Sequence, residues 1–442
     1  MAINIRLKKG QHVNLVDGST VTAIGKLGEG GQGIVYRVRV DRTGEEKALK
    51  WYFPSKLKDA PKFRERLAEN IAKGAPSPFF VWPETLTVWL NGTFGYIMRI
   101  YPSEYQSFPK YLLGRVKFGS TMAMVNAGLN IVTAFKDLHN AGLNYQDLND
   151  GNFSIEPKSG DVLICDNDNV VGHGMSSGIL GKARYIAPET VRDPVANPPD
   201  KLTDRFSLAV VLFLLLTGNH PLEGGKTNVA ALTNKFEKRF FGTEPVFIYD
   251  LQDSSNRPVP GLHRGVIAKW KYYPGFIKTA FQQSFSQDSL LKAEGRLLEQ
   301  QWIHLFMNMK SALVKCPHCH DEIFLGNGSV TNCPNCGKSI PVVGWLQFSK
   351  RSNIDISVPI FPGVRLYSYH MRKESDDYNT PVAIVRAKSG KYGLQNSGQD
   401  TWTVASPNGK SVKRTPGETT VLGDGFKIDF GQGNVAVVMA NK

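Results

Sequence analysis

The sequence has 442 residues, a formal net charge of +14 and five cysteines. This length predicts two to four domains with a sizeable core, and the apolar content is ordinary for a soluble protein. Residues 1–10 carry no apolar signal segment, and the longest apolar run, Leu208–Leu216, is too short to span a bilayer. We therefore expect a cytoplasmic protein without a membrane partner. The basic charge fits nucleic acid, an acidic partner, an anionic surface or the handling of phosphates, and does not choose among them.

A glycine cluster lies between two alternating segments near the start of the chain. Residues 21–39 alternate apolar and polar side chains around Gly28, Gly30 and Gly33, which predicts a hairpin with a glycine-rich turn. Glycines let backbone N–H groups approach phosphates, because no Cβ stands in the way. A dinucleotide fingerprint of the same spacing opens a helix, whereas residues 34–38 continue here as a strand. A plain turn is the remaining alternative.

A second polar cluster lies in the middle of the chain. Asp147 and Asn152 stand five positions apart, and an apolar run at residues 162–165 then leads into Asp166. Mg²⁺ and Mn²⁺ prefer oxygen ligands and share them with phosphates. Asn152 and Asp166 can supply such oxygens, while Asp147 can accept a proton or orient a hydroxyl. An ordinary pair of Asx-rich turns is the alternative.

The order and spacing of these segments resemble the protein kinase family. The family motifs H-R-D-x-x-x-x-N and D-F-G correspond to residues 145–152 and 166–168, with the letters partly changed. An A-P-E element follows at residues 187–189, and Asp204 opens an apolar helix. The resemblance covers roughly residues 15–312 and is to an atypical bacterial Ser/Thr kinase.

The resemblance implies a role for each matching residue. The implied catalytic residues are Asp147, Lys50, Asn152 and Asp166, and the last two would bind Mg²⁺ or Mn²⁺. The implied nucleotide-binding residues are Gly28, Gly30, Gly33, Val35, Ala48, Lys50, Glu69 and Met98. Lys50 would contact the phosphates of ATP and pair with Glu69 of a helix at residues 61–73, with Glu65 as the fallback. Asp204 would brace the backbone of the catalytic loop.

Three changes depart from the usual family pattern. Gln146 replaces an Arg that in many kinases binds a phosphorylated activation segment, so we expect activity without that switch, although Ser176 and Ser177 remain candidates for modification. Asn149 replaces a Lys that neutralises charge on the transferring phosphoryl group. Because this reaction depends on positioning and electrostatics, the loss costs catalysis unless another cation substitutes. Asp168 stands where the family has Gly, and its carboxylate is a candidate second metal ligand. A motif shifted by two residues is the alternative, and Asp166 is preferred because it directly follows the apolar run.

Four cysteines form a metal-binding pattern after the kinase-like region. Cys316, Cys319, Cys333 and Cys336 give C-x2-C-x13-C-x2-C. Each C-x-x-C turn aims two thiolates at one point, and two such turns make a tetrahedral Zn²⁺ site. The pattern resembles a zinc ribbon, and a four-Cys site is closed to water and therefore structural. A pair of disulfides is the alternative, which a reducing compartment disfavours.

The last hundred residues predict an all-β region. Short alternating runs are separated by Gly, Asn, Pro and Asp, as in a sandwich or barrel, and they are Val364–Tyr367, Val382–Ala387, Trp402–Ala405, Thr419–Leu422, Phe426–Phe430 and Val435–Met439. The later runs are similar to the last strands of forkhead-associated domains, which bind phosphothreonine peptides. The Gly-Arg and Ser-x-x-His elements of that family are not found here. A docking domain and a generic β-sandwich therefore remain open.

We predict a multidomain α+β protein from these patterns. A two-lobed kinase occupies residues 1–312, with its small lobe at about residues 1–100 and its large lobe at about 101–312. A zinc ribbon follows at residues 313–341, and a forkhead-associated-like β-sandwich at residues 342–442.

The predicted function is transfer of the ATP γ-phosphate to Ser or Thr of a protein substrate in a bacterial signalling pathway. The cofactors would be ATP, Mg²⁺ (or Mn²⁺) and Zn²⁺, and the resemblance also implies a partner phosphatase. A nucleotide-binding pseudokinase scaffold is the first alternative, and a nucleic-acid-associated kinase is the second. The basic residues are spread along the chain without a long Lys/Arg run, which argues against nucleic acid.

Overall fold

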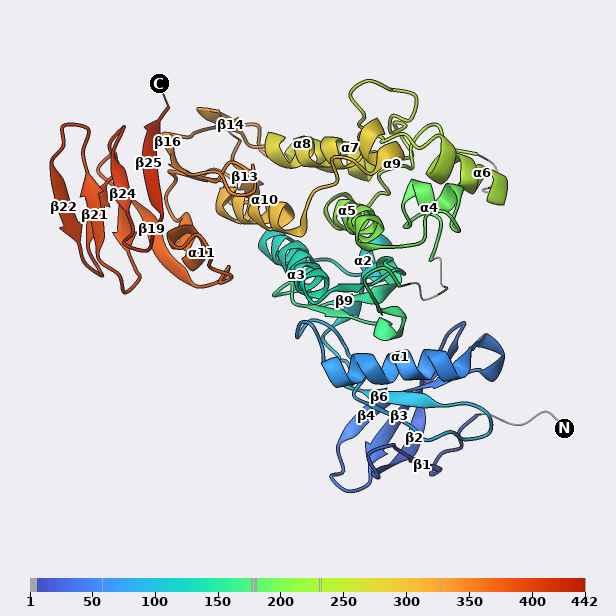
Figure 1. Ribbon diagram of the computed structural model, residues 1–442. Helices are drawn as coiled ribbons and strands as arrows, with labels where there is room; N and C mark the ends of the chain where they lie inside the picture. Colours follow the sequence, from blue (N-terminus) through green and yellow to red (C-terminus); the bar gives the residue numbers. More distant parts are fainter. Residues whose placement is uncertain are drawn as a thin grey trace. The chain divides into compact units, whose positions relative to one another are not determined.

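The computed structural model describes residues 6–57, 59–175, 178, 181–229, 231, 233–326 and 328–441. The chain divides into two compact units (Figure 1). The first consists of Met1–Lys117, Ala134–Pro157 and Asp161–Leu208, and the second of Phe118–Thr133, Lys158–Gly160 and Ala209–Lys442. The candidate modification sites Ser176 and Ser177 lie outside the described residues.

A six-stranded antiparallel sheet begins the first unit. Its strands, in the spatial order β1-β2-β3-β4-β6-β5, are β1 (His12–Asn14), β2 (Thr20–Glu29), β3 (Gly33–Val40), β4 (Glu46–Tyr52), β6 (Gly95–Met98) and β5 (Thr85–Leu86). Alternation along the strands separates two apolar clusters, because successive side chains point to opposite faces. Val21, Ile34 and Leu49 belong to one cluster, and Ala48 and Tyr96 to the other. The predicted hairpin over residues 21–39 is confirmed by the pairing of β2 with β3.

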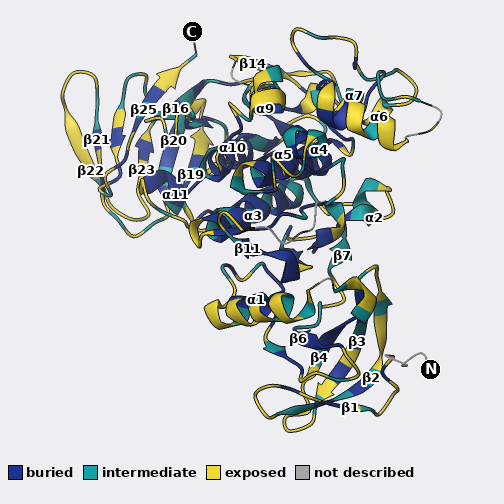
Figure 2. Ribbon diagram, turned by 45° about the vertical axis from the view of Figure 1, so that its right-hand side comes forward, coloured by how far each residue is buried: buried dark blue, intermediate teal, exposed yellow. Residues whose placement is uncertain are grey.

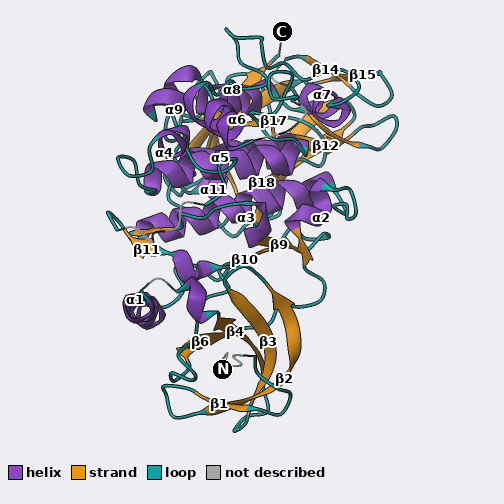
Figure 3. Ribbon diagram, turned by 90° about the vertical axis from the view of Figure 1, so that its right-hand side faces the viewer, coloured by secondary structure: helices purple, strands orange, loops and turns teal. Residues whose placement is uncertain are grey.

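Helix α1 (Ala60–Lys73) packs against the second of these clusters (Figure 3). The Asp59 side chain accepts a hydrogen bond from the Lys62 N–H at 3.2 Å, which caps the first turn and contributes about 1 kcal/mol. Leu67 is fully buried, and Phe63 and Ile71, four positions to either side, are half-buried against the same cluster. The predicted helix and its apolar face are confirmed.

The remainder of the first unit carries two small sheets that hold the polar loops. Strands β7 (Gln106–Ser107), β9 (Phe153–Ile155) and β10 (Val162–Ile164) pair in the order β10-β9-β7, and β8 (Leu143–Asn144) pairs with β11 (Val171–Gly172). Short helices α2 (Phe108–Leu112) and α4 (Pro188–Arg192) belong to the same unit. The loop from β8 to β9 contains Asp147 and Asn152, and the loop from β10 to β11 contains Asp166.

Two long helices, α3 (Thr121–Asn140) and α5 (Lys201–Thr217), have residues in both units. The second unit adds α6 (Asn234–Lys238), α7 (Arg264–Tyr272), α8 (Gly275–Ser284), α9 (Gln287–Lys292) and α10 (Glu299–Ala312). Helix α10 is buried along most of its length (Figure 2). Among the described residues, no helix has both the length and the apolar character that a bilayer crossing requires.

Two small hairpins follow α10, β12 (Leu313–Lys315) with β13 (Glu322–Phe324) and β14 (Val330–Asn332) with β15 (Ser339–Pro341). The first hairpin is anchored within the second unit. Glu322 Oε2 accepts a hydrogen bond from the Thr121 N–H of α3, and the Leu325 N–H donates to the Ala312 carbonyl at 2.9 Å. Backbone and side-chain bonds therefore connect the cysteine-rich segment to the helices of its own unit.

The C-terminal region is all β apart from the one-turn helix α11 (Ser368–Met371). One antiparallel sheet has the order β17-β16-β25-β24-β21-β22, with strands Ser357–Pro359, Gly344–Phe348, Val435–Ala440, Lys427–Asp429, Trp402–Ala405 and Ser411–Arg414. The other has the order β18-β19-β20-β23, with strands Arg365–Tyr367, Pro381–Lys388, Lys391–Asn396 and Thr419–Val421. The predicted all-β region is confirmed, and each predicted run overlaps a strand. Strands β16, β17, β20 and β22 were not predicted.

Side chains of helix α10 form hydrogen bonds to this β region. His304 Nδ1 lies 2.7 Å from the Tyr369 hydroxyl, and Asn308 Nδ2 donates to the Asp355 carbonyl at 2.7 Å. The buried Lys310 donates from Nζ to Asn379 Oδ1 at 2.7 Å. Buried polar groups are costly unless they are hydrogen-bonded, so these bonds specify how α10 and the β region pack.

A matched pair of glycine variants tests the packing of the turn at residues 158–160 on α3. Gly160 has a φ of +79°, and a Cβ there would lie 1.9 Å from the Ala123 carbonyl oxygen. Gly114 has a φ of +68°, but no described atom lies within 4 Å of its Cβ position. We expect Gly160→Ala to lower the free energy of unfolding by about 2 kcal/mol more than Gly114→Ala. Equal losses in chemical denaturation would contradict this packing.

Candidate active site

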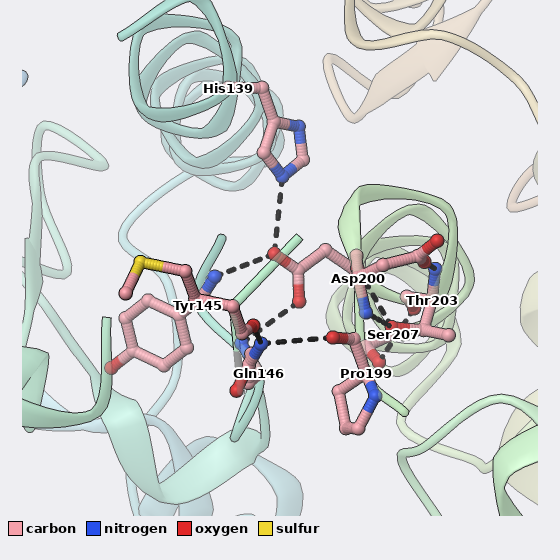
Figure 4. A network of polar contacts seen from close by, with 9 residues as sticks. His139, Tyr145, Gln146, Pro199, Asp200, Thr203 and Ser207 are labelled. Carbon is pink, nitrogen blue, oxygen red and sulfur yellow. Dashed lines mark hydrogen bonds and ion pairs between the residues drawn. The ribbon is translucent and has the colours of Figure 1, made fainter. Parts of the chain in front are cut away.

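A buried carboxylate on α5 holds the backbone of the loop that contains Asp147. Asp204 accepts hydrogen bonds from the Tyr145 N–H at 2.6 Å and the Gln146 N–H at 3.0 Å, and His139 Nε2 lies 3.2 Å from it (Figure 4). Charged acceptors make stronger hydrogen bonds than neutral ones. Gln146 has a left-handed backbone, with φ +67°, so the loop needs such a support. The predicted bracing role of Asp204 is confirmed.

The side chain of Gln146 joins this loop to two other segments. Its Nε2 donates to the Met175 carbonyl at 2.8 Å and to the Pro199 carbonyl at 2.9 Å. Both bonds are between neutral groups. Gln146, which stands at the position of the family Arg, thus binds backbone carbonyls and not a phosphorylated side chain.

Side-chain bonds also close the loop beyond Asp147. Asn149 Nδ2 donates to the Asp147 carbonyl at 3.0 Å and to Asp147 Oδ1 at 3.3 Å. The Asn149 N–H donates to Asn152 Oδ1 at 2.7 Å. Burial, and then the charge of Asp166, raise the pKa of Asp147 to about 6, against the opposing effects of Lys182 and Asn149. Asp147 is thus a carboxylate whose proton affinity is suited to proton transfer near neutral pH.

Lys182 is a cation beside this loop that the sequence analysis missed. Its Nζ donates to Asn149 Oδ1 at 2.9 Å, and it lies 4.0 Å from Asp150 Oδ1. The preceding Gly181 has a φ of +74°, and its Cβ position lies 3.2 Å from Asp147 Oδ1. The one available signal in the sequence was this Gly-Lys pair six residues ahead of the A-P-E element, and the spacing alone did not indicate a contact.

Lys50 is buried in β4 between two carboxylates. Its Nζ lies 2.7 Å from Asp168 Oδ2 and 3.2 Å from Asp166 Oδ1. Burial lowers the pKa of Lys50, but the charges of Asp168 and Asp166 outweigh this effect and hold that pKa above its ordinary value. The ammonium is therefore charged at any physiological pH.

Asp168 is the inner partner of Lys50. Its side chain has 0% exposure, and it also accepts a hydrogen bond from the Tyr52 hydroxyl. From α1, Arg66 donates to the Asp168 carbonyl at 3.4 Å, and Asn70 donates to the Val170 carbonyl at 2.8 Å. Lys50 and Tyr52 both contact Asp168 Oδ2, whereas the buried Asp168 Oδ1 has no hydrogen-bond partner among the described residues. The role of Asp168 as a second metal ligand stays a prediction.

The expected pairing of Lys50 with Glu69 is wrong. Glu69 is exposed, and in the described part of the chain no ion pair joins it to Lys50. Helix geometry gives the reason: Glu69 is two positions beyond the buried Leu67, about 200° around the helix, and therefore points away from the core. The fallback Glu65 is exposed as well. The inward positions are taken instead by Arg66 and Asn70, which are four residues apart.

The two predicted cation ligands are brought close together. The Cys165 N–H, next to Asp166, donates to the Asn152 carbonyl at 2.8 Å, and the Tyr145 hydroxyl donates to the Cys165 carbonyl. The Asp166 side chain is 57% exposed. Asn152 Oδ1 has one hydrogen bond, and an amide oxygen carries a second lone pair. A carboxylate and an amide oxygen are ligands that Mg²⁺ and Mn²⁺ prefer, so these residues fit the cation.

The glycines of the glycine-rich turn differ in the space that surrounds their Cβ positions. No described atom lies within 4 Å of the Cβ positions of Gly28 and Gly30, so their backbone is accessible to a phosphate. Gly33 has a different reason to be glycine, because a Cβ there would lie 2.2 Å from the Trp51 carbonyl oxygen. Gly33 is therefore required for the packing of β3 on β4.

The residues expected around adenine come from neighbouring strands. Val35 is opposite Lys50 in the pairing of β3 with β4, and Ala48 is opposite Met98 in the pairing of β4 with β6. Val35, Ala48 and Met98 belong to one apolar cluster. Leu163 of β10 joins this cluster and was not singled out from the sequence.

The four cysteines converge at the tips of the two small hairpins. Their sulfurs all lie within 4.8 Å of one another, with 3.9 Å between Cys316 and Cys336 and 3.6 Å between Cys319 and Cys333. Tetrahedral Zn–S bonds of about 2.3 Å place sulfurs about 3.8 Å apart. The cysteine cluster therefore has the dimensions of a Zn²⁺ site. No disulfide occurs among the described cysteines.

The partner of Lys50 can be tested with a matched pair of variants. Asp168→Asn removes the buried counter-charge of Lys50, and we expect the free energy of unfolding to fall by about 3 kcal/mol. Glu69→Gln changes an exposed residue and should alter it by less than about 0.5 kcal/mol. Chemical denaturation of both variants checks this, and a larger loss for Glu69→Gln would mean that α1 is rotated relative to the described structure.

Two curated proteins are similar to part of this chain. "Probable serine/threonine-protein kinase PknB" of Corynebacterium glutamicum is 26% identical over 220 residues, which cover 45% of this chain and 31% of that protein. "Protein kinase YegI" of Escherichia coli O157:H7 is 25% identical over 212 residues, which cover 47% of this chain and 31% of that protein. The match therefore spans about a third of the length of these curated relatives.

Two further comparisons concern the kinase domain itself. The solved kinase domain of PknI from Mycobacterium tuberculosis has 19% sequence identity and a TM-score of 0.38, with 49% of this chain and 80% of that chain covered. The model of the protein kinase domain matches residues 21–258, more than half of the chain. The chain belongs to the protein kinase family.

Proposed function

We propose that this protein is an active kinase that transfers the γ-phosphate of ATP to Ser or Thr hydroxyls of a protein substrate in a bacterial signalling pathway. The observation that carries the proposal is the convergence of four residues. Lys50 contacts Asp166, Asp166 follows the residue that is bonded to Asn152, and the charge of Asp166 helps to raise the pKa of Asp147. The names of two bacterial relatives, one of them a serine/threonine kinase, point the same way.

Each of these residues has a distinct part in the proposed reaction. Asp147 orients the acceptor hydroxyl and takes up its proton as the oxygen attacks the γ-phosphorus; the bond to the β,γ-bridging oxygen breaks, and ADP leaves. Lys50 positions the α- and β-phosphates as a point charge. Asp166 and Asn152 hold Mg²⁺ or Mn²⁺, which neutralises phosphate charge when bound. The open backbone at Gly28 and Gly30 covers the phosphates.

The proposal also assigns roles to the rest of the chain. The kinase domain extends over residues 1–312, a structural Zn²⁺ ribbon over residues 313–341, and a forkhead-associated-like region over residues 342–442. A docking role of the last region toward protein partners is proposed by analogy with forkhead-associated domains, to which its two-sheet architecture is similar. A partner phosphatase and a cytoplasmic location belong to the same proposal.

The first test is transfer of labelled γ-phosphate with Mg²⁺ or Mn²⁺ to the protein itself and to generic protein acceptors. We expect wild type to incorporate label, and Asp147→Asn to lower the rate on the order of 10²–10⁴-fold while ATP affinity is kept. Glu69→Gln is the control and should behave as wild type. If Asp147→Asn retains the transfer rate, the catalytic assignment is wrong.

A wild-type protein that binds ATP but transfers no label would favour the alternative of a nucleotide-binding scaffold. The absence of the family Lys at position 149 is the feature that keeps this second function open. Phosphoamino-acid analysis of the labelled product then distinguishes Ser and Thr from Tyr as the acceptor.

Metal analysis tests the zinc ribbon. We expect one Zn²⁺ per chain, and we expect Cys333→Ser to lose zinc and lower the melting temperature, because a structural zinc site contributes folding energy directly. Cys165→Ala is the control, since Cys165 lies outside the cluster, and its zinc content should be unchanged. A zinc-free wild type with intact disulfides would refute the metal assignment.

A further inference from the structure

The proposed site has an excess of negative charge that its own catalytic loop does not balance. Residues 145–152 contain two aspartates and no Lys or Arg. Lys50 is already buried between Asp166 and Asp168. Because phosphoryl transfer is accelerated by positive charge placed where negative charge develops, a cation beside Asp147 would accelerate transfer in addition to the Mg²⁺ or Mn²⁺ of the proposed function.

Lys182 is the cation that the structure places there. Its ammonium bonds to Asn149 Oδ1 at 2.9 Å, and the amide nitrogen of the same Asn149 lies 3.3 Å from Asp147 Oδ1. A single side-chain amide therefore separates the Lys182 charge from the catalytic carboxylate. The effect reaches Asp147, because the Lys182 charge opposes the rise in the pKa of that residue.

The surroundings of Lys182 do not indicate a structural ion pair. The side chain is 61% exposed, and its distance to Asp150 is 4.0 Å, the limit for an ion pair. Exposed pairs of this kind contribute little to stability. The long, exposed side chain can turn toward an incoming phosphoryl group, while Asn149 keeps its ammonium near the loop.

Asn149 has the complementary role. It is buried, and its Oδ1 accepts both the Lys182 ammonium and the Gly151 N–H at 3.0 Å, while its Nδ2 donates to Asp147. The residue that replaces a lysine in the loop is thus used to hold a lysine from another segment. Gly181 makes this approach feasible, because its missing side chain lets the segment pass against Asp147.

We propose that Lys182 is a catalytic residue that supplies the positive charge on the transferring phosphoryl group, and that Asn149 positions it. This inference rests on the proposed kinase function and adds to it that an essential cation lies on the segment between β11 and α4 rather than in the catalytic loop.

Removing the positive charge at position 182 and restoring it at position 149 tests the proposal. Lys182→Ala should lower kcat on the order of 10²-fold and change the affinity for ATP less than about threefold. In the double variant Lys182→Ala/Asn149→Lys, the charge returns from the loop side, and at least a tenfold recovery of kcat is expected. Lys73→Ala, an exposed lysine at the end of α1, is the control with wild-type kinetics.

The outcomes separate the inference from the proposed function. An unchanged kcat in Lys182→Ala overturns the inference, and so does a loss that the double variant does not restore, because such a loss reflects structure rather than charge. A second measurement is independent of turnover: binding of ADP with Mg²⁺ and aluminium fluoride, a planar mimic of the transferring group. Lys182→Ala should weaken binding of this mimic at least tenfold more than binding of ADP. This comparison of binding affinities tests the role of Lys182 even if wild type transfers no label to the acceptors tested. If Lys182→Ala weakens binding of the mimic and of ADP equally, the inference is overturned.

Discussion

The buried ion pair between Lys50 and Asp168 is the interaction on which the arrangement of the site depends. A lysine inside a sheet is tolerated only when opposite charge and hydrogen bonds compensate its desolvation. Asp168 and Asp166 supply that charge, and the Tyr52 hydroxyl binds Asp168 as well. Because both carboxylates lie on the loop after β10, this pair ties the loop to β4. Helix α1 contacts the same loop through Arg66 and Asn70, which donate to the carbonyls of Asp168 and Val170.

A second buried carboxylate, Asp204, supports the other side of the site. It binds two consecutive backbone N–H groups of a loop whose left-handed residue would otherwise be strained. Beyond that point the loop is closed by asparagine amides rather than by charged side chains. The Asn149 side-chain amide bonds to both Asp147 and Lys182, so it fixes the position of the Lys182 ammonium relative to the Asp147 carboxylate. Two charges therefore lie on other segments than the family pattern implies. The carboxylate that pairs with Lys50 is Asp168, on the loop after β10 rather than on α1, and the cation near Asp147 is Lys182, on the segment before α4 rather than in the catalytic loop.

The second unit shows how the additional modules are attached. Helix α10 is buried and is bonded to the β region through His304, Asn308 and Lys310. The cysteine hairpins contact α3 through Glu322. These contacts are polar and specific, and buried polar contacts fix a single packing arrangement more strictly than apolar ones. Within the second unit, these contacts join the cysteine hairpins and the β region to α3 and α10.

The sequence by itself determined the features that depend on local spacing. Strand alternation and glycine spacing specified the hairpin at residues 21–39. The apolar spacing of Phe63, Leu67 and Ile71 specified α1, and the cysteine spacing specified a cluster of four thiols with the dimensions of a Zn²⁺ site. Short or polar strands such as β22 gave no such signal, since Ser411–Arg414 has a largely exposed surface.

Only the tertiary structure decided which charges meet. The partner of Lys50 lies 118 positions away at Asp168 rather than on α1, and Lys182 reaches a loop 33 positions before it. These pairings depend on which side chains of α1 face the core and on the path of the segment that contains Lys182. Neither is encoded in hydrophobic periodicity, because polar residues on an exposed face and polar residues that face a site have the same local pattern.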